Sequence, residues 1–82
     1  MVKISFHQTF QKEFTKIKDK AIKEKIIKQL QKIRDDPEIG KPMKYSRKGT
    51  RELYIKPYRL SYSYTKEEST IIILELYHKD KQ

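Results

Sequence analysis

The chain has 82 residues, of which 35% are apolar, with no cysteine and a mean hydropathy of −0.94. This length allows one domain with a marginal core, because such a chain buries only about 60% of its unfolded surface. The missing cysteines exclude disulfides and thiolate metal sites. The net charge of +9 attracts polyanions. Nucleic acid is therefore the expected partner, while a membrane surface or an acidic protein would respond to the same charge.

No segment approaches the roughly 20 apolar residues of a membrane span, and the N-terminal residues have no apolar run of signal-peptide length. We therefore expect a soluble, cytoplasmic protein that has no membrane contact. The two histidines, His7 and His78, are far apart in the sequence. Without cysteines beside them they offer no first shell for a metal, so we expect neither a metal nor another cofactor.

The first half of the chain predicts a strand and two helices. Alternating apolar residues favour a strand over residues 2–6. Helical spacing then begins at His7 or Thr9, is interrupted at residues 18–20, and resumes up to residue 33. Pro37 ends this helical hairpin, because proline restricts the residue before it. The residues on the apolar stripe of the two helices are Phe10, Phe14, Ile17, Ala21, Ile22, Ile26, Leu30 and Ile33.

Residues 38–50 show no period, and glycine and proline mark them as a loop. The loop is basic, since it contains Lys41, Lys44, Arg47 and Lys48. It precedes two strands, residues 51–55 and 58–64, which a tight turn at Lys56 and Pro57 joins.

Successive strand residues point to opposite faces, so alternate positions in each of the two strands belong to the same face of the sheet. One face collects the apolar residues Leu53, Ile55, Tyr58, Leu60, Tyr62 and Tyr64. The other collects Glu52, Tyr54, Arg59, Ser61 and Ser63. The first face is the predicted core surface, and the second is exposed to solvent.

Residues 66–69 predict a turn and residues 70–77 a last strand, whose apolar run 71–74 indicates a central position covered on both faces. Counting by parity places Ile72, Leu74 and Leu76 under the helices. Glu75, Tyr77 and Lys79 then fall on the solvent-exposed face, beside Tyr54 and Arg59.

The predicted order is strand, helix, helix and three strands within a single domain, residues 1–82. Each element has one apolar side, so the fold class is α+β: an antiparallel sheet with the helical hairpin packed on one face. The open face would carry Arg59, Tyr54, Tyr77 and Lys79.

The order of elements, the strand Arg51–Ile55, the strand Tyr58–Tyr62 and the closing residues Leu76–Lys79 together resemble the RelE/ParE toxin superfamily. The resemblance covers nearly the whole chain. It implies a RelE-like fold and a toxin of a type II toxin–antitoxin pair. RelE-type members cleave mRNA in the ribosomal A site with the 2′-hydroxyl of the mRNA as nucleophile. It also implies a partner, a small acidic antitoxin that wraps the toxin with an amphipathic segment.

The resemblance assigns roles to single residues. Arg59 matches the arginine that RelE-like enzymes place at the scissile phosphate, and Lys79 stands where many members have a second arginine. Tyr54 and Tyr77 are candidates for base stacking or proton relay, and together these four form the expected catalytic set. Glu52 is a weaker candidate for a general base, because a carboxylate repels phosphates. The expected RNA-binding residues are Lys56, Arg51, Lys44, Arg47, Lys48 and His78.

Other interpretations stay open. Glu52 and Tyr54 stand where ribosome-dependent members often have basic residues, and no tyrosine follows Lys79. Arg59 could simply pair with Glu52 or Glu75 across the sheet, which contributes roughly 0–1 kcal/mol. ParE-type members inhibit DNA gyrase instead of cleaving RNA, and a toxin without catalysis would only bind its antitoxin.

Overall fold

The computed structural model describes residues 2–43 and 49–78. The expected order of elements is confirmed, with one addition, the two-residue strand β2. The elements are β1 (Lys3–Phe6), α1 (Gln8–Lys16), α2 (Lys20–Asp35), β2 (Lys41–Pro42), β3 (Thr50–Ile55), β4 (Tyr58–Thr65), the 3-10 turn η2 (Lys66–Glu68) and β5 (Thr70–His78).

The break between the two helices has a local cause. The Asp19 carboxylate caps α2 by accepting hydrogen bonds from the backbone N–H groups of Ala21 and Ile22, at 2.8 and 3.3 Å. An aspartate in this position satisfies donors that have no partner within the helix. His7 caps α1 in the same way, since its Nδ1 accepts from the N–H of Thr9 at 3.1 Å. The polar interruption in the sequence is therefore a start signal for the second helix.

The sheet has the strand order β1-β5-β4-β3-β2. Its central pairs are antiparallel, but β1 runs parallel to β5, so the sheet is mixed rather than antiparallel throughout as expected. Hairpin turns force neighbours in sequence to pair antiparallel, whereas parallel strands need a longer connection. Nearly the whole chain separates β1 from β5, and this connection leaves the direction of β1 free.

A bulge in β5 changes the parity count. Ser61 pairs with Glu75 but Tyr62 pairs with Ile73, so Leu74 is an extra residue on β5. The bulge turns Ile73 toward the core and Ile72 away from it, and Ile72 is 36% exposed. The predictions that Ile72 and Leu74 lie under the helices, and that this run is covered on both faces, were therefore wrong. The core consists of Phe10, Ile17, Ile26, Ile33, Ile55, Leu60, Tyr62, Ile71, Ile73 and Leu76.

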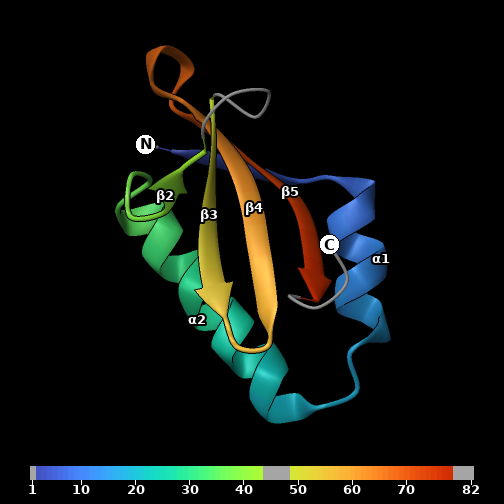
Figure 1. Ribbon diagram of the computed structural model, residues 1–82. Helices are drawn as coiled ribbons and strands as arrows, with labels where there is room; N and C mark the ends of the chain where they lie inside the picture. The colour runs from blue at the N-terminus through green and yellow to red at the C-terminus, as the bar shows by residue number, and fades with distance from the viewer. Residues whose placement is uncertain (1, 44–48, 79–82) are drawn as a thin grey trace.

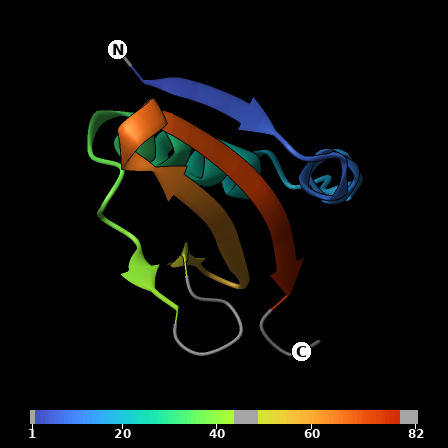
Figure 2. The same cartoon turned by 90° about the horizontal axis from the view of Figure 1, so that it is seen from above.

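Figure 1 shows α2 behind β3 and β4, and α1 alongside β5. Seen from above, α1 lies end-on beside the end of β1 (Figure 2). The face of β3 and β4 turned toward the viewer in Figure 1 has no helix over it, and we call it the uncovered face. Among the described residues, no helix is long and apolar enough to cross a membrane.

Candidate active site on the uncovered sheet face

The strand register arranges the side chains of the uncovered face in rows. One row contains Tyr54, Arg59 and Tyr77, because Arg59 pairs with Tyr54 on β3 and with Tyr77 on β5. In the next row Ser61 stands between Glu52 and Glu75. The predicted neighbourhood of Arg59, Tyr54 and Tyr77 is therefore present, despite the bulge in β5, because the bulge lies beyond these pairs.

Arg59 is held in place by two neighbours. Its Nη1 donates a hydrogen bond to Oε1 of Glu52 at 3.3 Å, and its guanidinium carbon lies 5.8 Å from the centre of the Tyr54 ring. Such a position above an aromatic ring is favourable for a cation. Its Nε is buried and has no acceptor among the described residues. The side chain as a whole is 34% exposed, so a bound anion can reach the exposed part of the guanidinium but not the buried Nε.

Glu52 is the junction of the site. Its carboxylate accepts from Arg59 through Oε1 and from the Tyr77 hydroxyl through Oε2. The residue is only 8% exposed, and burying a carboxylate is costly unless it is paired and hydrogen-bonded. Arg59 and Tyr77 supply this compensation. A base, a cation and a phenol proton are therefore connected within one cluster.

Tyr54 differs from its neighbours because it is 52% exposed. An exposed ring beside a cation offers a stacking surface for an unpaired base. Tyr54 is the last residue but one of β3, close to the turn that leads to β4.

The remaining predicted RNA-binding residues do not form one group in the structure. Nη1 of Arg51 donates to the carbonyl oxygens of Glu38 and Gly40, at 3.0 and 2.8 Å. His78 pairs with Tyr58 in the row on the helix side, and their rings meet edge to face at 5.5 Å. Lys56 is exposed in the β3–β4 turn. The other four predicted residues, Lys44, Arg47, Lys48 and Lys79, lie outside the described residues.

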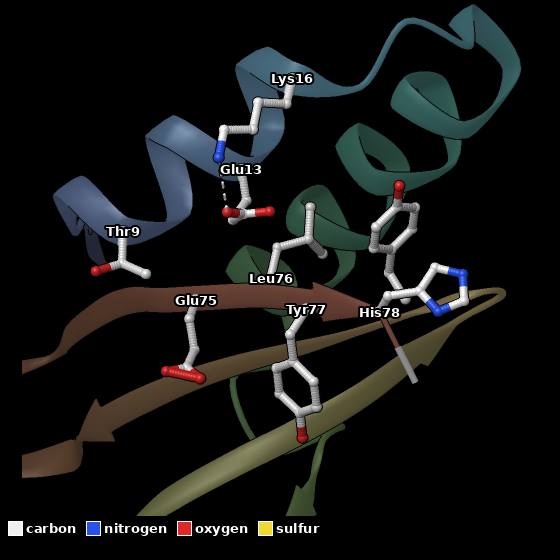
Figure 3. Close-up of a pocket in the computed structure, with 8 residues that line it drawn as sticks. Thr9, Glu13, Lys16, Glu75, Leu76, Tyr77 and His78 are labelled. Carbon is white, nitrogen blue, oxygen red and sulfur yellow. Dashed lines mark ion pairs between the residues drawn. The ribbon is translucent and has the colours of Figure 1, made fainter. Parts of the chain in front are cut away.

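A groove of about 490 Å³ adjoins the row at Tyr77. Its walls are α1 and the last residues of β5, and Figure 3 shows Leu76 directed toward the helices while Glu75 and Tyr77 point the other way. An ion pair between Lys16 and Glu13, at 3.5 Å, stands on the α1 wall. Among the described residues, Tyr77 is the one member of the cluster of Glu52, Arg59 and Tyr77 that lines this groove.

Sequence reasoning missed the bond between Glu52 and Tyr77. The signal that could have found it is parity, which places both on the uncovered face, but one strand, β4, lies between them and they are 25 positions apart in the sequence. It also missed the role of Tyr62, whose hydroxyl donates to the carbonyl oxygen of Pro37 at 2.8 Å and accepts from the N–H of Gly40 at 2.9 Å. Burial raises the pKa of the Tyr62 phenol above its ordinary value.

A five-strand mixed sheet with two helices is also the fold of several solved toxin structures. A chain of the intact RelBE toxin–antitoxin complex of E. coli is 18% identical, with a TM-score of 0.80 over 95% of this chain and 96% of that one. A chain of the RelBE2 complex from Mycobacterium tuberculosis is 25% identical, with a TM-score of 0.81 over 96% and 94%. The YoeB/ParE toxin from Agrobacterium tumefaciens is 15% identical, with a TM-score of 0.83 over 94% and 98%.

The model of one sequence family, the ParE toxin of the type II toxin–antitoxin system parDE, matches residues 4–82. The chain belongs to this family, and thus to the RelE/ParE toxin superfamily that the sequence resembled. A search of curated proteins gives no match.

Proposed function

We propose that this toxin is an endoribonuclease that cleaves mRNA on the ribosome by attack of a 2′-hydroxyl. The observation that carries the proposal is the cluster in which the Glu52 carboxylate accepts from both Arg59 and Tyr77. Cleavage of this kind needs a group that removes the 2′-proton, a cation at the phosphate and a proton for the leaving oxygen. The cluster contains one residue for each task.

The proposed reaction keeps its protons within the cluster. Glu52 takes the proton of the 2′-hydroxyl, the 2′-oxygen bonds to phosphorus, and the bond from phosphorus to the 5′-oxygen breaks. Tyr77 gives its proton to the departing 5′-oxygen. The products are a 2′,3′-cyclic phosphate and a 5′-hydroxyl. The hydrogen bond between Tyr77 and Glu52 is then the path by which the proton on Glu52 returns to the phenolate.

Arg59 stabilises the charge of the phosphorane in this scheme. Arginine suits the task because its planar fork pairs with phosphate oxygens and stays charged. The side chain of Arg59 is 34% exposed, which supports direct contact between the guanidinium and the phosphate. Tyr54 stacks on a neighbouring base, and Lys79 stays proposed as a further phosphate contact.

A cognate antitoxin is the proposed protein partner. Two of the similar structures, from E. coli and M. tuberculosis, are toxin–antitoxin complexes. The charge of +9 favours an acidic antitoxin. The exposed side chains of Phe6 and Ile27 offer apolar contacts to an amphipathic segment.

The test is primer-extension mapping of mRNA ends after induction of the wild type and of Arg59→Ala. New ends at defined codons in the wild type, absent in the variant, are the expected result. A wild type that arrests growth and leaves mRNA intact would contradict the proposal.

The match to the ParE family favours a second candidate, inhibition of DNA gyrase without RNA chemistry. In that case the pairing of Arg59 with Glu52 is a structural contact within a binding surface. Induction would then cause a DNA-damage response, and purified toxin would inhibit supercoiling by gyrase.

A further inference from the structure

Hydrogen bonds from a buried tyrosine and an arginine hold the segment between α2 and β2 against the sheet. We call these hydrogen bonds the clamp. Tyr62 is fully buried, and its hydroxyl bonds both Pro37 and Gly40. Arg51, which pairs with Tyr62 across β3 and β4, donates to the carbonyl oxygen of Gly40. A single segment of backbone therefore receives hydrogen bonds from two strands.

Gly40 fits this clamp because it has no side chain. A Cβ atom at this position would lie 2.6 Å from the Tyr62 hydroxyl oxygen and 2.8 Å from its Cε1. The close approach of backbone and ring fixes where the chain enters β2, one residue later.

The clamp determines the position of Lys41. This residue pairs with Glu52 in the register of β2 and β3, so the two side chains leave the sheet on the same face. Lys41 is exposed, and it extends the row of Glu52, Ser61 and Glu75 toward the β2 edge. The register thus sets Lys41 opposite Glu52, the residue that binds Arg59.

We propose that Lys41 is a phosphate-binding residue of the RNA site and that Tyr62 and Arg51 are its positioning residues. The inference rests on the proposed function. An RNA strand that crosses the face from Tyr77 past Arg59 has a second phosphate near Glu52. An ammonium at the β2 edge binds that phosphate and offsets the repulsion by the carboxylate. Because β2 has only two residues and a short pairing with β3, the hydrogen bonds of Tyr62 and Arg51 to Gly40 help to fix its position.

The test measures binding of a short, fluorescein-labelled single-stranded RNA whose 2′-hydroxyls are methylated, so that it cannot be cleaved. The variants are Lys41→Gln, Tyr62→Phe and the double variant, with Lys28→Gln on the exposed side of α2 as the matched control. We expect Lys41→Gln to weaken binding several-fold. It should also lower the slope of log Kd against log salt concentration by about 0.7, the value for one phosphate contact on a single strand.

Tyr62→Phe is expected to weaken RNA binding and to lower the salt slope, as Lys41→Gln does. The double variant should bind RNA as tightly as the single variant that has the lower affinity. A merely structural role of Tyr62 would not change the number of phosphate contacts. Arg51→Gln is the second test, because it removes hydrogen bonds to the same segment and keeps the buried phenol. It should reproduce the lower salt slope even if Tyr62→Phe fails to fold.

Equal Kd and salt slope for Lys41→Gln and Lys28→Gln would overturn the inference, while RNA cleavage by the wild type would leave the proposed function intact. If the losses of RNA affinity in Lys41→Gln and Tyr62→Phe add up in the double variant, Tyr62 does not act through Lys41, and its positioning role is wrong. A wild type that neither binds the RNA nor cleaves mRNA would refute the proposed function, and this inference with it.

Discussion

Glu52 and Arg59 form a diagonal pair across β3 and β4, with Oε1 and Nη1 3.3 Å apart, although the residue directly opposite Arg59 is Tyr54. The diagonal leaves the guanidinium over the Tyr54 ring and next to the carboxylate at the same time. A phosphate at Arg59 must therefore compete with Glu52. In the proposed reaction, the same proximity brings the Glu52 carboxylate close to a phosphate at Arg59.

Arg59→Lys should lower the rate of RNA cleavage by about 100-fold, because a lysine keeps the charge but loses the planar fork. Arg59→Ala should lower it further and also reduce the free energy of unfolding by about 1–3 kcal/mol, since Glu52 loses a partner. Primer extension and urea unfolding measure the two effects. Arg34→Lys, on the exposed surface of α2, is the control and should cleave like the wild type.

Glu52→Gln should have opposite effects on RNA cleavage and on RNA binding. The amide cannot take the 2′-proton, so cleavage should fall by about 100-fold. RNA binding should tighten, because a negative charge beside the phosphate is removed. The control is Glu75→Gln, which removes a charge from the same row and leaves Glu52, the proposed general base, unchanged. This variant should keep its cleavage activity. Equal cleavage by Glu52→Gln and the wild type would rule out Glu52 as the base.

Tyr77→Phe should lower cleavage by about 100-fold through loss of the proton donor. It should also reduce the free energy of unfolding by roughly 1 kcal/mol, because Oε2 of the buried Glu52 loses a hydrogen bond. Single-turnover cleavage and urea unfolding are the measurements. Tyr64→Phe, a half-buried tyrosine outside the cluster, should leave the rate unchanged.

The raised pKa of Tyr62 predicts a loss of stability in alkali. Above about pH 10 the unfolded chain releases the phenol proton while the folded chain retains it, so the folded state binds more protons and stability falls as pH rises. The contribution of the buried phenol to the free energy of unfolding is therefore fully present below pH 10. Lysines titrate in the same range, so the difference between the wild type and Tyr62→Phe in urea unfolding at pH 8 and above pH 10 is the measurement. A difference independent of pH would contradict this assignment.

Gly40→Ala should destabilise the protein by about 1–3 kcal/mol, because the new Cβ meets a buried ring that cannot move aside freely. Pro37 and Gly40 would lose their bonds to Tyr62 if the ring shifted. Urea unfolding measures the loss. The neighbouring change Lys41→Ala, at an exposed position, should cost much less.

Periodicity alone determined the helices, the strands β1, β3, β4 and β5, and the side of the sheet that Arg59 and Tyr54 occupy. This succeeded because β3 and β4 form a tight hairpin, in which parity and register are local. The parallel direction of β1 and the inward turn of Ile73 depend on pairings with distant strands and on one bulge. No local pattern contains that information.

The sequence by itself thus determined the fold class and the cation at the centre of the site. Only the tertiary structure decided that Glu52 is shared by Arg59 and Tyr77, and that Arg51 binds backbone carbonyls. Hydrogen bonds between residues far apart in the chain depend on the strand order and on which groups burial leaves without water. Both are determined only when the sheet packs on its core, so the local sequence pattern does not contain them.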